Sequence, residues 1–253
     1  MPFRVATLNL EQDHKRWERR RPLIEAEIAR LKPDIVGLNE VSIPLQTARG
    51  LGRTAGAACD RTFNLVQQTR INGLSEVEGE ALLSAFPVRE TGNLDFRTQD
   101  IVALVARLDI GGTLVDVYVT HLYRSVGDDS LRLFQVQKLL SWIDSRDDVG
   151  HAIVCGDFNA TLDKPSAALM ATRFRPTQTA PTAFTPLAGA GGEISHPYWP
   201  RMDRCIDYIW VSEKVRVVAS GTCFDRASAD DATLWPSDHA GVWADLELSG
   251  RNE

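Results

Sequence analysis

The sequence contains no apolar run that approaches the length needed to cross a membrane. Its first residues do not form an apolar signal region either, because a strand-like stretch begins at Phe3. The lack of both features predicts a cytoplasmic protein without a membrane-spanning segment.

Cysteines are few and show no regular spacing. Cys59, Cys155, Cys205 and Cys223 lie far apart in the sequence, and no two of them have the spacing of paired metal ligands. We therefore expect buried, reduced thiols. Since paired histidines are missing as well, the sequence does not indicate a zinc site.

The sequence also lacks a basic surplus. It has 28 lysines and arginines against 34 acidic residues, which gives a formal net charge of −6. Tight, sequence-independent binding to nucleic acid depends on excess positive charge. The overall charge therefore does not support a nucleic-acid partner, although a local basic patch is compatible with it.

No internal repeat, low-complexity segment or clear linker divides the chain, so we expect a single domain over residues 1–253 and a monomer. Apolar and β-branched runs predict many strands and a few helices. Strands are predicted at 3–10, 35–41, 63–69, 81–86, 101–110, 113–122, 152–155, 205–211, 215–224 and 242–246. Helices are predicted from 17 to 31, within 44–61, after 129 and near 166–170, the last in a long irregular loop over 161–200.

The first helix carries an unusual arginine cluster. Ile24, Ile28 and Leu31 recur at helical spacing and predict the buried face, which Trp17 and Arg20 share. The arginines at 19–21 are nevertheless interpreted most simply as a solvated face. A proline at position 22 is compatible with the first turn of a helix.

The most informative stretch is Ala152–Ala160, where an apolar run ends at Gly156 and Asp157, Phe158 and Asn159 follow. Side chains two positions apart on a strand point the same way, so Asp157 and Asn159 are expected to aim at one point while Phe158 enters the core. A carboxylate beside an amide suits a hard cation, or a phosphate and its attacking water. An Asx-turn that closes the strand explains the same residues.

Other polar side chains also lie at, in or just before apolar strands. They are Asn9, Glu40, His121, Asp207, Asp238 and His239. Each has an ordinary explanation alone, such as a surface histidine or a turn-forming aspartate. Their joint occurrence is harder to explain, because a shared sheet edge would gather carboxylates, amides and imidazoles into one pocket. Phosphoryl-ester hydrolysis needs such groups around Mg²⁺ or Mn²⁺.

Two features have alternative interpretations. Tyr118 lies two strand positions before Thr120, where it either reaches the site or packs in the core. Tyr198, Trp199 and Arg201 of the long loop either form a substrate rim or pack beneath the loop.

Seven short motifs occur in one order along nearly the whole chain. They are Thr7-Leu8-Asn9-Leu10, Leu38-Asn39-Glu40-Val41, Ala81-Leu82-Leu83-Ser84 with Pro87, Thr120-His121-Leu122, Gly156-Asp157-Phe158-Asn159, Ile206-Asp207-Tyr208-Ile209 and Ser237-Asp238-His239. In these motifs the sequence resembles the endonuclease/exonuclease/phosphatase superfamily. The resemblance implies an α/β fold, a four-layer α/β sandwich in which two mainly antiparallel β-sheets pack face to face with helices outside. It also implies a divalent-metal-dependent phosphoesterase that uses Mg²⁺ or Mn²⁺.

The resemblance further implies which residues hold the metal ion. Glu40 corresponds to the principal metal carboxylate, with Asn9 beside it and Asp238 completing the ligand shell. Glu11 stands where some members carry a further acid on the metal side.

The remaining site residues correspond to those that act on water and phosphate. Asp157 and Asn159 would position and activate the attacking water. His239, oriented by Asp207, would contact a phosphate oxygen or transfer a proton, and His121 would contact the phosphate from the other side.

The leading interpretation is a phosphodiesterase or phosphomonoesterase that acts on a phosphorylated small molecule, a nucleotide, a nucleic acid or a lipid headgroup. A nuclease acting on DNA or RNA ends is an alternative that the acidic composition disfavours. A catalytically silent binding module is another, and the full set of polar residues counts against it. A calcium-binding structural protein does not explain the two histidines.

Overall fold

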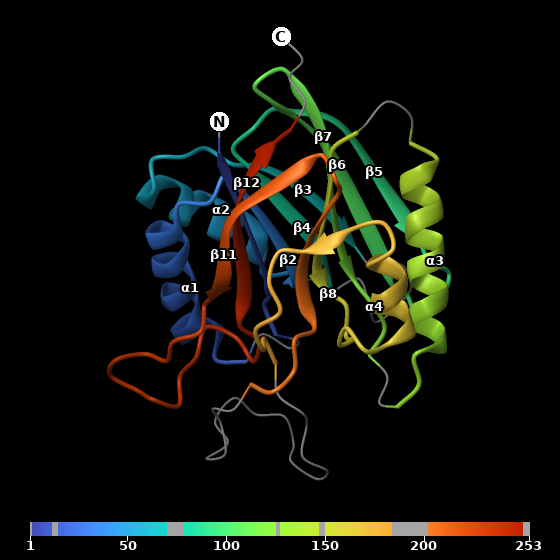
Figure 1. Cartoon of the computed structure of the whole chain (residues 1–253). Helices are drawn as coiled ribbons and strands as arrows, with labels where there is room; N and C mark the ends of the chain where they lie inside the picture. Colours follow the sequence, from blue (N-terminus) through green and yellow to red (C-terminus); the bar gives the residue numbers. More distant parts are fainter. Residues whose placement is uncertain are drawn as a thin grey trace.

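Two six-stranded β-sheets form the centre of the structure (Figure 1). The computed structural model describes residues 2–11, 15–69, 78–124, 127–146, 150–183 and 202–249. One sheet has the strand order β11 (Val215–Cys223), β12 (Gly241–Leu248), β1 (Phe3–Asn9), β2 (Ile35–Ser42), β4 (Glu78–Ser84) and β3 (Asn64–Thr69). The other has the order β5 (Val88–Asp95), β6 (Val102–Ile110), β7 (Thr113–His121), β8 (Ala152–Asp157), β10 (Asp207–Val211) and β9 (Arg175–Pro176).

Helices cover the outer faces of both sheets, as Figure 1 shows. Helices α1 (Trp17–Leu31) and α2 (Thr47–Ala58) lie on the β1–β2 side, and α3 (Ser130–Asp144) and α4 (Pro165–Met170) lie on the β7–β8 side. The predicted four-layer α/β sandwich is therefore confirmed.

Three apolar clusters hold these layers together. The first fills the space between the sheets and includes Val5, Val117, Ile209 and Ala244. The second joins α3 and α4 to one sheet, and the third joins α1 and α2 to the other. The alternation predicted for the last strand is confirmed, because every second side chain from Val242 to Leu246 is buried between the sheets.

A parallel strand pair lies at the centre of each sheet and determines where the strand ends meet. β1 pairs with β2, and β7 pairs with β8, in parallel, while the other strand pairings among the described residues are antiparallel. In register, Asn9 lies opposite Asn39 and His121 lies opposite Asp157. The carboxyl ends of all four strands therefore lie at one edge of the sandwich, the position where α/β sheets commonly bind ligands.

Several local predictions need correction. Strand β5 was not predicted, because most of its side chains are exposed or half-buried and give no apolar pattern. Pro22 lies inside α1, past its first turn. Arg20 is fully buried, so the expectation of a solvated face is wrong for it, although Arg19 is exposed as predicted. The helical period of the sequence places Arg20 on the apolar face of α1, and this agrees with its burial in the structure.

Tyr118 belongs to the core between β7 and α3. Its ring packs edge-on against Trp142 with centroids 5.3 Å apart, and its hydroxyl donates to Asp116 Oδ2 at 3.4 Å. The core interpretation is therefore the right one. Tyr198, Trp199 and Arg201 lie outside the described residues.

The structure also bears on the cysteines and on the expectation of no membrane-spanning segment. All four cysteines are free, with Cys205 half-buried and the other three buried. Among the described helices, none is long and apolar enough to span a bilayer.

Candidate active site

Three side chains from separate segments converge on one carboxylate oxygen, Oδ2 of Asp157. Asp157 ends β8 and is 2% exposed. The Nδ2 atom of Asn9 lies 3.3 Å from this oxygen, the Nε2 atom of His121 lies 3.5 Å away, and the Nε2 atom of His239 lies 3.9 Å away. The structure therefore brings these four residues together at one edge of the sandwich.

Glu40 lies next to this centre because β2 has a bulge. The register with β4 shifts between Leu38 and Val41, and Glu40 has a φ of 54°, in the left-handed region. A bulge redirects a side chain and is common next to active sites. As a result, Glu40 Oε1 accepts a hydrogen bond from Asn9 Nδ2 at 3.1 Å and lies 3.9 Å from His121 Nε2.

His239 and Asp207 form a hydrogen-bonded pair. The Nδ1 atom of His239 lies 2.8 Å from Asp207 Oδ2, and the two side chains are 13% and 1% exposed. Asp207 lies opposite Asp157 at the start of β10, which explains why both acids flank the imidazole. The predicted orienting contact between Asp207 and His239 is present.

The acids of the pocket bind protons unusually tightly. Burial, with the nearby Asp207 charge, raises the pKa of Asp157 to about 7. Burial and the Asp238 charge raise the pKa of Glu40 to about 8, and the same two causes raise the pKa of Glu11 to about 8. Burial is the main cause of these shifts, and the closeness of other carboxylates adds to it.

The pKa of His239 is shifted in the direction that favours its cationic form. Burial acts to lower the pKa of His239, but the charge and hydrogen bond of Asp207, with Asp238 and Asp157, hold that pKa well above its ordinary value. The ring is therefore an imidazolium at neutral pH, with Nδ1–H donating to Asp207 and Nε2–H facing Asp157.

Asn159 does not follow the predicted strand geometry. The strand ends at Asp157, and Asn159 has a φ of 50°. The backbone N–H of Asn159 donates to Asp157 Oδ1 at 2.7 Å, and its Nδ2 donates to the carbonyl of Leu122 at 2.9 Å. The expectation that both side chains aim at one point through continued strand geometry is therefore wrong. Asp157 closes an Asx-turn with one oxygen and faces the cluster with the other, while Phe158 is buried as predicted.

Asn39 and Glu80 are buried polar residues that the sequence did not single out. The Asn39 side chain accepts a hydrogen bond from the Asp157 backbone N–H at 2.9 Å. Its Nδ2 donates to the carbonyl of Thr120 at 3.1 Å and to Glu80 Oε2. Asn39 thereby ties β2 of one sheet to β7 and β8 of the other. Its position beside Glu40, and an acid inside an otherwise apolar strand, were the available signals.

Two neighbouring groups of side chains are candidates for holding a cation. The ligand atoms of Asp157, Asp207 and His239 lie within 4.8 Å of one another. The group expected from the resemblance is Asn9, Glu40 and Asp238. Asp238 is half-buried and close enough to Glu40 to raise its pKa. Asn9 Oδ1 accepts the N–H of Glu11 at 3.0 Å, so the amide nitrogen of Asn9 faces the acids.

Comparison with known structures gives the same fold. A mannosyl-6-phosphatase from Bacteroides thetaiotaomicron is 19% identical, with a TM-score of 0.74 over 97% of this chain and all of that one. The human Nocturnin catalytic domain with bound sulfate is 24% identical, with a TM-score of 0.73 over 98% and 94%. D. rerio TDP2 complexed with a single-strand DNA product is 17% identical, with a TM-score of 0.76 over 98% and 99%.

No curated protein matches the chain significantly. A family model nevertheless supports the same relationship from the sequence. The family model described as the endonuclease/exonuclease/phosphatase family matches residues 6–239, a span that contains every motif described above. The chain therefore belongs to the endonuclease/exonuclease/phosphatase family.

Proposed function

We propose that this protein is a divalent-metal-dependent phosphoesterase, which hydrolyses a phosphodiester or a phosphomonoester by attack of water. The observation that carries the proposal is the convergence of Asn9, His121 and His239 on Asp157 Oδ2, with Glu40 beside them. A buried carboxylate surrounded by two imidazoles and an amide has the groups that activation of water and binding of phosphate require.

The residues present fit a hard divalent cation. Glu40 and Asp157 have raised pKa values because they are buried and lie near other carboxylates, and a cation would stabilise their charged forms. The available donors are mainly carboxylate oxygens, which suit Mg²⁺ or Mn²⁺. Glu40 and Asp238 would hold the ion, and the Asn9 amide would hydrogen-bond to Glu40 beside it. When bound, it supplies charge neutralisation on the phosphate oxygens.

Asp157 is assigned to the attacking water. One of its oxygens is fixed by the backbone N–H of Asn159, and the other faces the two imidazoles. With a pKa of about 7, the carboxylate is a base matched to neutral pH. Asp157 would therefore orient the water and accept its proton, while Asn159 fixes the Asp157 carboxylate through its backbone N–H.

The two histidines are assigned to the phosphate. His239 is held as an imidazolium by Asp207, so its Nε2–H donates to a nonbridging or leaving oxygen. His121 faces the same carboxylate from β7 and would contact the phosphate from the opposite side.

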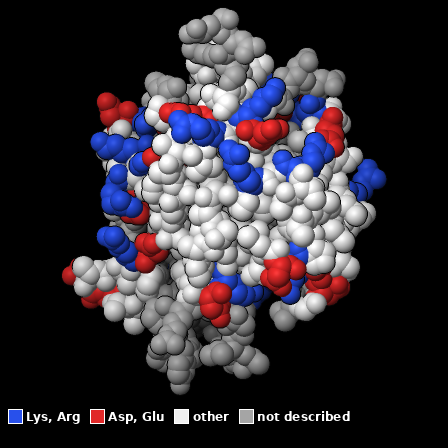
Figure 2. All heavy atoms as spheres, viewed as in Figure 1, with Lys and Arg blue, Asp and Glu red and all other residues white. Residues whose placement is uncertain are grey.

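Charge distribution bears on the substrate class. Figure 2 shows basic and acidic side chains interleaved on the face of the molecule that it draws, with no continuous basic stripe among the residues described there. The similar structures include a mannosyl-6-phosphatase and a TDP2 complex with single-strand DNA product. Together with the net charge of −6, the interleaved surface favours small phosphorylated compounds or single-stranded ends over a long duplex.

The direct test is hydrolysis of p-nitrophenyl phosphate and bis-p-nitrophenyl phosphate with Mg²⁺, with Mn²⁺ or with a chelator. We expect metal-dependent turnover of at least one ester, and its loss in Asp157→Ala and His239→Ala. Matched controls are Asp163→Ala and His151→Ala, whose parent side chains lie on the surface. Turnover that survives in Asp157→Ala, or no turnover of either ester by the wild type with any metal, would refute the proposal.

A further inference from the structure

Arg20 connects several segments around the candidate site from a fully buried position at the start of α1. Its Nη1 donates to the carbonyl of Leu10 at 3.0 Å and to the carbonyl of Pro236 at 2.7 Å. Its Nε donates to the carbonyl of Lys15 at 2.6 Å, and its Nη2 lies 3.3 Å from Glu11 Oε2. One guanidinium group therefore makes contact with three backbone carbonyls and one buried carboxylate.

Arg20 holds the chain at Leu10 and at Pro236, and both segments lead directly to site residues. Leu10 follows Asn9, and Pro236 is two residues before Asp238 and three before His239. Ser237 adds a contact between the same segments, since its hydroxyl donates to the carbonyl of Asn9. Ser237 Oγ also accepts the His239 N–H at 3.2 Å. The position of the imidazole thus depends on how the Pro236 segment is fixed against α1.

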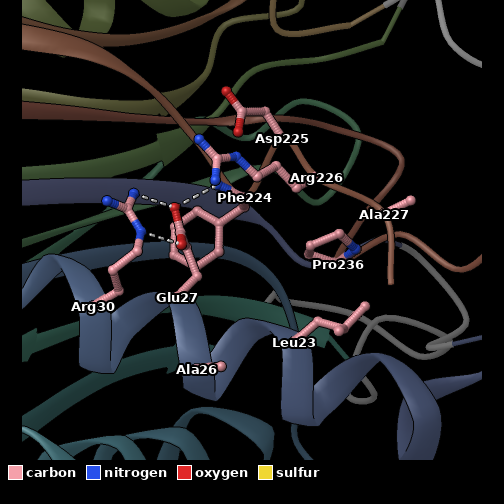
Figure 3. Close-up of a pocket in the computed structure, with 9 residues that line it drawn as sticks. All are labelled: Leu23, Ala26, Glu27, Arg30, Phe224, Asp225, Arg226, Ala227 and Pro236. Carbon is pink, nitrogen blue, oxygen red and sulfur yellow. Dashed lines mark hydrogen bonds and ion pairs between the residues drawn. The ribbon is translucent and has the colours of Figure 1, made fainter. Parts of the chain in front are cut away.

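A pocket lies beside the contact between α1 and this segment. Figure 3 shows it between α1 and residues 224–236, with Leu23 and Ala26 on one side and Phe224 and Pro236 on the other. Its volume is about 220 Å³. Next to the pocket, Arg20 adds a buried hydrogen bond from α1 to the Pro236 carbonyl. The ion pairs from Arg16 and Arg19 to Asp231 lie nearer the surface.

The charge of Arg20 also matters to the pocket. Glu11 has both carboxylate oxygens buried, and it stands two residues after Asn9. Arginine keeps its proton at any accessible pH, so the guanidinium is a fixed positive charge whose Nη2 lies 3.3 Å from Glu11 Oε2. A cation bound at Glu40 and Asp238 would then not need to neutralise Glu11 as well.

We propose that Arg20 is a positioning residue of the phosphoesterase site. It holds the Pro236 segment, and with it Asp238 and His239, in register with Asn9, and it keeps Glu11 paired and away from the cation ligands. This inference rests on the proposed function. It assigns to Glu11 a guanidinium partner within the protein, where the resemblance had suggested a further acid on the metal side.

The test compares Arg20→Met with Arg19→Met, its exposed neighbour on the same helix. Three quantities are measured: the Kd for Mn²⁺ by electron paramagnetic resonance, kcat and KM for the ester that is turned over, and the ¹H–¹⁵N shifts of the His239 imidazole. For Arg20→Met we expect a Kd about 10- to 100-fold weaker, a lower kcat with an unchanged KM, and displaced imidazole shifts. Arg20→Lys keeps the charge but not the planar fork and should fall between. Arg19→Met should match the wild type.

Removal of Arg20 alone leaves the Leu10 and Pro236 carbonyls without their buried donor and removes the charge beside Glu11, and such a change destabilises a fold. The double variant Glu11→Gln/Arg20→Met removes both charges and keeps the test available if the single variant does not fold. We expect the double variant to fold, with lowered kcat and displaced His239 shifts, because the Leu10 and Pro236 carbonyls still lack their donor.

The outcomes separate the two proposals. A folded Arg20→Met or double variant with wild-type Kd, kcat and imidazole shifts, next to an active wild type, would overturn the positioning role alone. A wild type that neither binds Mn²⁺ nor hydrolyses a phosphate ester would overturn the proposed function and this inference with it.

Discussion

The Nδ1 atom of His239 lies 2.8 Å from Oδ2 of Asp207, although the two residues belong to opposite sheets of the sandwich. Asp207 begins β10 in one sheet, and His239 lies two residues before β12 in the other. The pair therefore links the sheets at the edge where the other polar side chains gather. Because Asp207 accepts from one ring nitrogen, the opposite nitrogen of His239 is presented to the pocket.

Removal of the Asp207 charge should weaken the imidazolium. In Asp207→Asn, we expect the pKa of His239 to fall toward its ordinary value of about 6.5, because the strongest stabilising charge is lost. The kcat at pH 7.5 should fall about 10- to 100-fold. NMR titration of the His239 imidazole and steady-state kinetics check both effects. An Asp163→Asn control changes an exposed acid, and an unchanged His239 titration in Asp207→Asn would contradict the assignment.

Asp157 should be needed for turnover more than for folding. Asp157→Asn keeps the acceptor for the Asn159 N–H but loses the base, so we expect kcat to fall at least about 100-fold. Loss of one excess buried charge should leave the unfolding temperature of the metal-free protein unchanged or raised. Stopped assays with chelated and Mn²⁺-loaded protein, beside thermal unfolding, measure the two effects. Near-wild-type kcat in Asp157→Asn would show that another group accepts the proton.

Stability of the metal-free protein should depend on pH in a defined direction. Glu11 and Glu40 have pKa values of about 8 when folded, against 4.5 for an unperturbed glutamate, and the pKa of Asp157 is raised to about 7. His239 is raised as well. Between about pH 4.5 and pH 8 the folded chain thus holds more protons than the unfolded chain. The free energy of unfolding therefore falls as pH rises through this window.

A divalent cation should reverse that loss, because it binds the deprotonated acids. At a free Mg²⁺ or Mn²⁺ concentration about 100 times Kd, the folded state gains about 2.7 kcal/mol, a rise in Tm of roughly 5–10 °C. At one fixed metal concentration, the rise in Tm should be larger at pH 8 than at pH 5.5, because more of the carboxylates are deprotonated at pH 8. Calorimetry with metal and with chelator tests this, with Glu40→Gln as the variant expected to flatten the pH slope. Equal metal-induced shifts at both pH values would argue against carboxylate ligands.

Gly156 should not accept any side chain. Its φ is +130°, and a Cβ atom there would lie 2.0 Å from the Thr120 carbonyl oxygen and 2.9 Å from Asn39 Oδ1. Gly156→Ala should cost at least about 2 kcal/mol of unfolding free energy and displace Asp157, the next residue. Gly112→Ala, with a φ of +86° and no neighbour within 4 Å, isolates the backbone strain and should cost about 1 kcal/mol. Urea unfolding of both variants measures the difference, and equal losses would contradict the steric argument.

The motifs at the strand ends could be recognised in the sequence because each depends on a local pattern. Apolar runs that stop near Asn9, Glu40, His121 and Asp157 indicated where β1, β2, β7 and β8 end. In the structure β1, β7 and β8 end at Asn9, His121 and Asp157, while β2 continues to Ser42. Strand β5 escaped detection because its exposed side chains carry no such pattern. The continued strand geometry expected for Asn159 failed, because an Asx-turn at Asp157 redirects the chain after one residue.

The amino-acid sequence by itself determined which polar groups stand at the ends of which buried strands, since alternation and burial are local properties of the chain. Only the tertiary structure decided which of these groups meet. Two facing parallel strand pairs bring Asn9 and Asp157 within 3.3 Å across 148 residues, and the bulge at Glu40 turns its carboxylate toward them. The hydrogen bond from Arg20 to Pro236 and the bridge made by Asn39 were also decided by the tertiary structure, because both join segments that no local pattern relates.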